Sequence, residues 1–475
     1  MDRCQTSSLR YFQSSQPHPS IAVIGAGFAG LATVGRLREL GFKDVTLFEG
    51  LDRFGGRVYS TPFGKGMLQQ GAQWINGHDN EIYRIAKKLN LVIGELDDNA
   101  VFTGAEIHAG KCQPNQSLIK EFYDFAVPLE QNYRTLARSK AFYGKGMGEL
   151  YAKDFQEFIN RKQRTRQELN VLEAMSRFYM GFWEGENGAF QDYALANFSL
   201  WDDGEGMSKS YVLNEEGFWG VAKFLKSRVP DEAIRYNHTV TNIDYSSDQT
   251  VLTVQIGVDT AIYPKKFDHV VVTSSLGHLK KYAKSMFSPQ LPEKKLTAID
   301  ALGYGNLLKI FLIYEKPWWK YEGSSIAALR VKDCALSSPL MEFFHTFKAL
   351  EWDNNVLVGW ISAIGAQMID GVTDPYLTEL ITEHFRDVMQ DQSIPMPKQM
   401  IRTRWVGNEL FRGAYSYVSE RSAGMPNGGY EDMAAPVDSK IFFAGEATSS
   451  KMFQTTVGAY ESGVREAERI AGLYQ

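Results

Sequence analysis

A glycine-rich turn near the start of the chain is the first feature that suggests a chemistry. Gly25, Gly27 and Gly30 form the pattern G-x-G-x-x-G directly after an apolar run that begins at Ile21. The first glycine permits a tight bend, the second lets the backbone approach a pyrophosphate, and the third lets helix and strand pack closely. Glu49, 19 residues after Gly30, could accept hydrogen bonds from ribose hydroxyls. These residues predict a dinucleotide site, and a purely structural glycine turn is the alternative.

Three further blocks extend this pattern. Gly55 and Gly56 precede Arg57, and this stretch could wrap a second phosphate. The other two blocks contain Gly71, Ala72, Gln73 and Trp74, and then Gly445, Glu446, Thr455, Thr456 and Val457. With these blocks the chain resembles the flavin amine oxidase family over roughly residues 20 to 472, in particular its polyamine oxidase and spermine oxidase branch.

The resemblance implies FAD as the cofactor. Val240 would lie on the adenine, residues 71–74 would run past the flavin ring, and Trp405 would pack near it. Glu446 could hold a ribityl or pyrophosphate-side hydroxyl. The helix that starts near Val457 would direct its positive end at the flavin N1–C2=O edge, which favours the reduced state; a helix with small residues for close packing is the alternative. Ala414 stands where monoamine oxidases have the cysteine that bonds FAD, so noncovalent binding is expected.

The resemblance also implies a reaction. A hydride would pass from the carbon next to an amine nitrogen to flavin N5, and a polyamine would give an aminoaldehyde, a shortened amine and H2O2 with O2 as acceptor. No metal or protein nucleophile is needed. Lys309 is a cation inside an apolar strand, in a stretch similar to the one whose lysine bonds a water at N5. We predict that role for Lys309; a lysine that faces solvent is the alternative.

The substrate would lie between aromatic walls and near acids. Tyr415 is expected to form one wall and Phe453 the opposite one, with core packing as the alternative for each. Asn76 replaces the histidine of animal polyamine oxidases, and an amide cannot titrate near neutral pH; His78 is a weak substitute. The candidate anchors for the amine are Glu184, Glu186 and Asp192, and the runners-up are Asp202, Asp203 and Glu205.

These residues need a scaffold that brings distant segments together. Residues 21–25 and 45–48 are buried strands on either side of a helix over 31–40, which is a βαβ unit. A helical pattern follows from Asn80 to Arg166, pocket-lining loops from Phe182 to Asp203, and further strands up to residues 441–445. We therefore predict an α/β fold in which a discontinuous Rossmann-type FAD-binding domain (20–79, 210–288 and 400–475) holds an inserted α+β substrate-binding domain (80–209 and 289–399), after a flexible tail (1–19).

Composition narrows the class of protein. The chain has 475 residues and a net charge of −5, so no basic field favours nucleic acid. No apolar run reaches the ~18 residues of a membrane span. Cys4, Cys112 and Cys334 are odd in number and far apart, which predicts neither a disulfide framework nor a zinc site and fits a reducing compartment. We expect a cytoplasmic location; a mitochondrial one stays open.

Two other functions stay open, and the oligomeric state is not predicted. The first is a flavin amine oxidase that acts on a monoamine, an amino acid or a modified lysine. A histone-demethylase role is disfavoured, because the chain leaves no room for a long helical insertion. The second is a flavin-binding protein without turnover.

Overall fold

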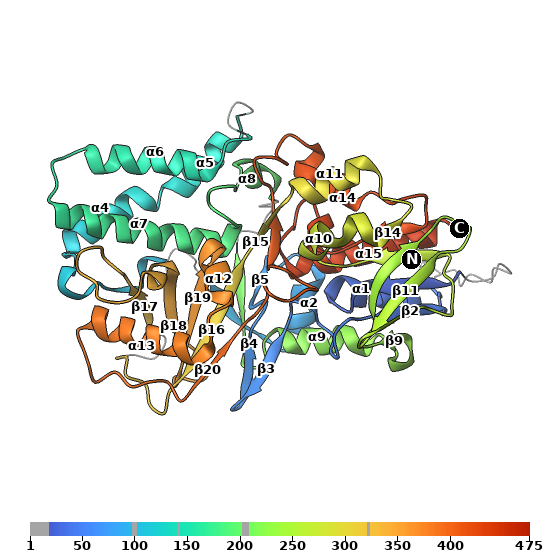
Figure 1. The fold of residues 1–475 in the computed structure, drawn as a ribbon, viewed down its shortest axis with the longest axis horizontal. Coiled ribbons are helices and arrows are strands. Elements are labelled where there is room, and N and C mark those ends of the chain that lie inside the picture. Colours follow the sequence, from blue (N-terminus) through green and yellow to red (C-terminus); the bar gives the residue numbers. More distant parts are fainter. Residues whose placement is uncertain (1–18, 97–101, 140–142, 202–208, 321–323) are drawn as a thin grey trace, which may run out of the picture.

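The computed structural model describes residues 19–96, 102–139, 143–201, 209–320 and 324–475, so the predicted tail lies almost wholly outside them. Two halves lie side by side along the long axis of the molecule (Figure 1). One half is built on a parallel sheet and holds the first strand and the last helix. The other holds a larger sheet and the 22-residue helix α7 (Arg166–Asn187). The predicted α/β class is confirmed.

Five strands form the parallel sheet, in the order β22-β13-β1-β2-β9. They are β1 (Ile21–Ile24), β2 (Val45–Phe48), β9 (Ile234–Arg235), β13 (His269–Val272) and β22 (Ile441–Phe443). Every residue of β1, β2 and β13 is buried, as is typical of apolar strands covered on both faces. Helices α1 (Phe28–Glu39), α9 (Phe218–Ser227) and α15 (Thr456–Gly472) cover one face, and α10 (Leu276–Met286) the other.

The larger sheet has six strands in the order β20-β16-β19-β18-β17-β7. They are β7 (Glu106–His108), β16 (Leu307–Ile313), β17 (Ser325–Ala328), β18 (Phe344–Ala349), β19 (Val356–Ser362) and β20 (Gln399–Arg402). Side chains alternate along β16. Its even-numbered residues pack with those of α13 (Asp374–Met389), whereas Phe311 and Ile313 pack on the opposite face, near Leu68. Lys309 shares this second face.

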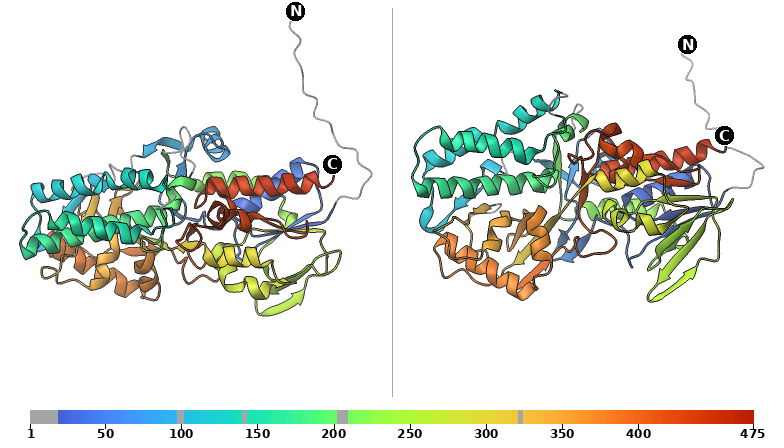
Figure 2. Two further views of the ribbon diagram at one scale, coloured as in Figure 1. Left: turned by 90° about the horizontal axis from the view of Figure 1, so that it is seen from above. Right: turned by 45° about the horizontal axis from the view of Figure 1, so that its top comes forward.

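The remaining elements are short sheets and surface helices. The other strands are β3 (Ser60–Phe63), β4 (Gly66–Gln69), β5 (Trp74–Asn76), β6 (Val92–Leu96), β8 (Ser210–Leu213), β10 (Thr239–Asp244), β11 (Val251–Ile256), β12 (Asp259–Ile262), β14 (Phe287–Ser288), β15 (Gly303–Gly305) and β21 (Tyr415–Tyr417). The other helices are α2 (Glu81–Lys88), α4 (Gln116–Ala126), α5 (Leu129–Ala137), α6 (Met147–Asn160), α8 (Ala196–Leu200), α11 (Glu293–Ala301), α12 (Ala363–Asp370) and α14 (Tyr430–Ala434). Helices α4–α7 pack together as a layer beside the larger sheet (Figure 2).

Two segments differ from the sequence-based prediction. The stretch from Asn80 to Arg166 is not helical throughout, because β6 and β7 interrupt it. The expected loop from Phe182 to Asp203 begins instead as the last turns of α7 and contains α8. Both errors have one cause: local pattern does not show that β6 pairs with β8, or that the end of α7 packs on distant strands.

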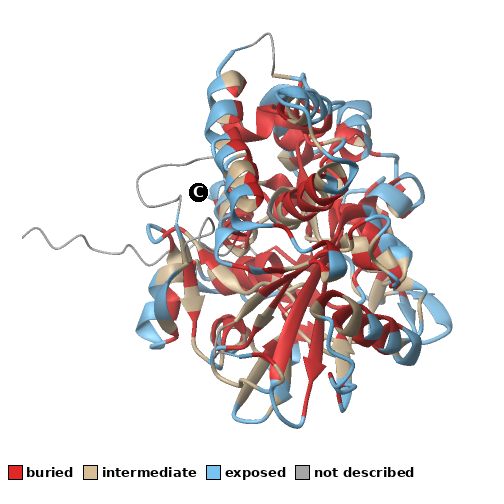
Figure 3. Ribbon diagram, turned by 90° about the vertical axis from the view of Figure 1, so that its left-hand side faces the viewer, coloured by how far each residue is buried: buried red, intermediate tan, exposed pale blue. Residues whose placement is uncertain are grey.

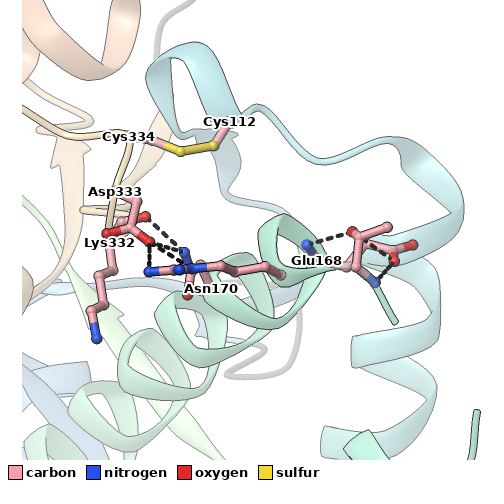
Figure 4. Close-up of a disulfide and its surroundings, with 8 residues drawn as sticks. Cys112, Glu168, Asn170, Lys332, Asp333 and Cys334 are labelled. Carbon is pink, nitrogen blue, oxygen red and sulfur yellow. Dashed lines mark hydrogen bonds and ion pairs between the residues drawn. A yellow bond between two sulfur atoms is a disulfide. The ribbon is translucent and has the colours of Figure 1, made fainter. Parts of the chain in front are cut away.

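The expectation that the cysteines form no disulfide framework is also corrected. The structure joins Cys112 and Cys334 by a disulfide, with 6.0 Å between their Cα atoms (Figure 4). The two are 222 residues apart, and they meet because β7 pairs with β17 in parallel, which places the segments after both strands side by side. Beside the bond, Asp333 accepts a hydrogen bond from the Asn170 amide of α7. Spacing rules cannot detect a pair that depends on strand order.

The disulfide makes a stability prediction. Cys112→Ser should lower the free energy of unfolding by about 2–4 kcal/mol, because the bond restrains a long loop of the unfolded chain. Thermal unfolding with and without a dithiol reductant checks this: the reductant should lower the unfolding temperature of the wild type and leave that of Cys112→Ser unaltered. Alkylation of the native, unreduced protein should modify neither Cys112 nor Cys334; two accessible thiols there would contradict the pairing.

The buried residues are distributed according to the layers of sheets and helices. The strands at the centre of the molecule are buried and the outward faces of the helices are exposed (Figure 3). Within the described ranges, no helix combines the length and the apolar character needed to cross a bilayer. The largest groups of buried side chains therefore lie between the sheets and their helices, where they fix the strand ends that carry the site.

Candidate active site

A cavity of about 310 Å³ lies where the two halves meet. Most of the residues predicted for a cofactor or substrate site line it: Gly25, Gly27, Glu49, Gly55, Gly56, Arg57, Gly71, Ala72, Gln73, Trp74, Asn76, Val240, Lys309, Trp405, Tyr415, Gly445, Glu446, Thr455 and Thr456. The predicted residues that do not line it are Gly30, Val457, Glu184, Asp192 and Phe453. Glu186 belongs to α7, but its side chain is outside the described part of the chain, as are Asp202, Asp203 and Glu205.

The glycine turn forms a cradle between β1 and α1. A Cβ atom on Gly56 would lie 3.1 Å from the Cα of Gly27, so the turn and the second glycine pair are packed backbone to backbone. A Cβ on Gly30 would lie 1.8 Å from the Gly25 carbonyl oxygen, which explains why Gly30 packs behind the wall rather than in it. The Glu49 carboxylate accepts hydrogen bonds from the Ala26 N–H (2.7 Å) and the Leu51 N–H (2.8 Å).

An ion pair at the cavity joins Arg57, from the amino-terminal part of the chain, to Glu446, from the carboxyl-terminal part. The Nη1 atom of Arg57 donates to Oε1 of Glu446 at 2.9 Å and to the Ala414 carbonyl at 2.6 Å. The other oxygen of Glu446 accepts from the Ser416 hydroxyl (2.6 Å) and the Gln454 N–H (3.0 Å). Glu446 is 4% exposed, so both of its oxygens are buried acceptors with protein donors.

Lys309 is buried, which excludes the alternative of a lysine facing solvent. It is 4% exposed, and its Nζ donates to the carbonyls of Gln69 (3.1 Å) and Gly71 (2.7 Å) and to Oε1 of Gln73 (2.7 Å). The same Nζ lies 5.7 Å from the centre of the Trp74 ring. The strand β16 thereby holds the loop that lines the cavity and places a cation beside it.

The amino-terminal end of α15 also reaches the cavity. Thr455 caps the helix, since its hydroxyl oxygen accepts from the Gly458 N–H at 3.0 Å. Thr456 lines the cavity, and its buried hydroxyl oxygen has no hydrogen-bond partner among the described residues. A helix start with an unpaired donor suits an electron-rich edge of a ligand. Val457, 1% exposed, packs behind this turn. This end and the glycine cradle fit a flavin dinucleotide.

Of the two aromatic residues expected to enclose the substrate, Tyr415 lines the cavity and Phe453 does not. The Tyr415 hydroxyl donates to the carbonyls of Glu184 (3.1 Å) and Gly185 (2.7 Å) at the end of α7. Phe453 is 1% exposed and stacks on Tyr430, with ring centres 4.8 Å apart. Trp201, whose ring centre is 5.3 Å from that of Phe453, lines the cavity instead. Phe453 therefore packs in the core, as its alternative interpretation had it.

The predicted anchors Glu184 and Asp192 lie outside the lining of the cavity. Oε1 of Glu184 accepts from the Phe190 N–H at 3.1 Å, and burial raises the pKa of Glu184 to about 7. Asp192 accepts from the Tyr417 hydroxyl at 3.0 Å. Asn76 and Ser210 line the cavity, and among the described residues the carboxylates that line it are Glu49 and Glu446. His78 contacts the Tyr211 hydroxyl at 2.9 Å and does not line the cavity.

One group among the lining residues that were not predicted follows a strand of the parallel sheet. Thr273, Ser274, Ser275 and His278 follow β13 and begin α10. The Ser275 hydroxyl oxygen caps that helix by accepting from the His278 N–H at 3.1 Å. A usable signal existed, because polar residues at the carboxyl end of a buried parallel strand lie at the crevice where ligands bind.

Comparison with known proteins identifies the family of this chain. The family model described as flavin containing amine oxidoreductase matches residues 28–471. The peroxisomal N(1)-acetyl-spermine/spermidine oxidases of Bos taurus and Homo sapiens are each 26% identical to this chain, over 96% of it and 95% of their own length. Lysine-specific histone demethylase 1 homolog 2 of Arabidopsis thaliana is also 26% identical, over 97% of this chain but 59% of its own length. The chain belongs to the family of flavin containing amine oxidoreductases.

Proposed function

We propose that the protein is an FAD-dependent polyamine oxidase that acts on spermine, spermidine or their N-acetylated forms. The observation that carries the proposal is one cavity that joins the glycine cradle to the Lys309–Trp74 contact and the Tyr415 wall. Relatives named as acetylpolyamine oxidases, aligned over nearly their whole length, support the substrate class. Noncovalent binding is supported by Ala414, which lines the cavity with a methyl group that cannot bond flavin.

The domain division belongs to this proposal. We assign residues 20–79, 210–288 and 400–475 to a Rossmann-type FAD-binding domain and residues 80–209 and 289–399 to a substrate-binding domain. All five strands of the parallel sheet fall in the first set, and all strands of the larger sheet except β20 fall in the second. The cavity lies between the two sheets, which is where a cofactor on one domain could meet a substrate on the other.

The chain's own residues prepare the amine for oxidation. A bound flavin supplies the acceptor for the hydride from the carbon next to nitrogen. The rings of Tyr415, Trp201 and Trp74 exclude water from the cavity, which lowers the pKa of an enclosed amine and favours its reactive unprotonated form. Lys309 fixes the loop at Gln69 and Gly71 and holds a positive charge at its edge.

Peroxide formation tests the proposal. Purified protein with its flavin is incubated in air with spermine, spermidine and N-acetylspermine, and H2O2 is followed. At least one polyamine should yield peroxide and an aminoaldehyde. The histone demethylase relatives make methylated lysine the second candidate, so a dimethyl-lysine peptide is assayed in parallel. Peroxide from the peptide and none from any polyamine would assign the chain to that substrate.

Glu184 gives the proposal a pH signature. Its pKa of about 7 lies above the ordinary 4.5 because of burial, so its contribution to stability is fully present below pH 4.5 and is lost as the pH rises through 7. Glu184→Gln should therefore raise stability by ~3 kcal/mol near pH 8 and by much less near pH 5. Thermal unfolding at both values checks this; an equal gain at both would contradict the raised pKa.

The same carboxyl should set substrate affinity. We assign Glu184 the distal ammonium of the polyamine, which only the ionised form attracts. In the wild type, KM should fall as the pH rises through 7, and Glu184→Gln should flatten that dependence. Glu184 itself does not line the cavity, but the adjacent Gly185 does. Asp192→Asn is the matched control, because burial also raises the pKa of Asp192, whose carboxylate accepts from the Tyr417 hydroxyl. It should keep the wild-type dependence on pH.

A further inference from the structure

Gln454 adopts a backbone conformation that its side chain disfavours. Its φ is 70°, in the left-handed region, although it is not glycine, and it lines the cavity. Such a conformation costs free energy and persists only where the surrounding structure imposes it. Here two hydrogen bonds do so. The Gln454 N–H donates to Oε2 of Glu446 at 3.0 Å, and its Nε2 donates to the Asn187 carbonyl at 2.6 Å.

Asn187 is the last residue of α7. The Glu184 carbonyl accepts from the Gly188 N–H at 3.2 Å, and the carbonyls that follow it have no partners within the helix. Two side chains that line the cavity supply donors to them. Tyr415 donates to the carbonyls of Glu184 and Gly185, and Gln454 donates to that of Asn187. The end of α7 is therefore held from the cavity side, at the turn that carries Glu184.

We propose that Gln454 is a positioning residue for the substrate: it fixes the last turn of α7 against the Arg57–Glu446 ion pair. The inference deepens the proposed function and rests on it for the substrate. Through its backbone Gln454 contacts Glu446, and through its side chain the helix end. The left-handed backbone directs these two groups in different directions. A glycine at position 454 would relieve the backbone strain but lose the hydrogen bond to Asn187. Gln454 therefore holds the end of α7 in place at a cost to the stability of the fold.

Gln454→Gly tests this inference. The variant should unfold at the same temperature as the wild type or higher and keep its flavin. Its KM for the best polyamine should rise about tenfold, which corresponds to the loss of one hydrogen bond, and kcat should stay within about twofold. Hydrogen exchange at the amides of residues 184–188 should become faster. If Gln454 served only the fold, Gln454→Gly would lower the unfolding temperature and leave KM unaltered.

Gln390 offers a matched control. It too has a left-handed backbone, with φ of 54°, and its Nε2 donates to a carbonyl at a helix end, that of Asp387 at 2.6 Å. It is exposed and does not line the cavity. Gln390→Gly should accelerate exchange only at the end of α13 and leave KM unaltered. Wild-type KM and wild-type exchange at α7 in Gln454→Gly would overturn the inference. If the wild type oxidises no polyamine, the proposed function fails, and exchange at α7 alone decides the role of Gln454.

Discussion

Lys309→Met should reduce kcat by about 100-fold or more while the protein keeps its flavin. One preorganised hydrogen-bond donor at a reacting centre contributes a factor of about 10²–10³, and methionine retains the length of the side chain without the charge. The substitution also leaves the Gln69 and Gly71 carbonyls without their donor, so the loop that lines the cavity should loosen. Steady-state turnover with the best polyamine measures kcat, and the flavin absorbance of the purified variant shows whether it keeps its flavin.

Lys295→Met is the control for burial of a lysine. Lys295 is 2% exposed and donates to the carbonyls of Asp432 (2.9 Å) and Met433 (2.7 Å), but it does not line the cavity. Its loss should destabilise the fold and leave kcat per bound flavin unaltered. Equal turnover in Lys309→Met and the wild type would remove the assignment of Lys309 as a catalytic residue.

Arg57→Met should abolish flavin binding and lower the free energy of unfolding by about 3–5 kcal/mol, because Glu446 would remain buried without its cation. The Ala414 carbonyl would lose its donor as well. Denaturant unfolding and the flavin content after purification measure the two effects separately.

The double variant Arg57→Met with Glu446→Gln separates stability from binding. A neutral amide at position 446 removes the unpaired charge, so much of the lost stability should return. The flavin should not return, because the arginine itself is assigned to the cofactor. A single Arg57→Met protein that remains yellow after dialysis would show that this ion pair serves the fold alone.

The cofactor side of the site could be predicted from sequence because its geometry is local. Gly25, Gly27 and Glu49 lie at the carboxyl ends of β1 and β2, and adjacent parallel strands bring their ends together without further information. Arg57 lies only eight residues after Glu49, so a short turn is enough to bring it to the same strand ends. Lys309 was found as a cation in an apolar strand, but its burial depends on which face of β16 meets the loop at Gly71.

The substrate side could not be predicted to the same depth. Phe453 and Trp201 are both aromatic, and only the packing of Phe453 on Tyr430 decides which of them reaches the cavity. The role of Gln454 depends on Asn187, 267 residues away. Cys112 and Cys334 likewise meet through the pairing of β7 with β17. Each of these contacts joins separate segments of the fold, which periodicity along the chain does not record.

Anaerobic bleaching of the flavin tests the central claim most directly, because it requires no later step with O2. The oxidised protein is mixed without O2 with spermine, spermidine, N-acetylspermine and a dimethyl-lysine peptide, each in a separate reaction. The account predicts that at least one polyamine removes the yellow absorbance rapidly and that the peptide does not. Bleaching by the peptide alone, or by none of the four amines, would contradict it.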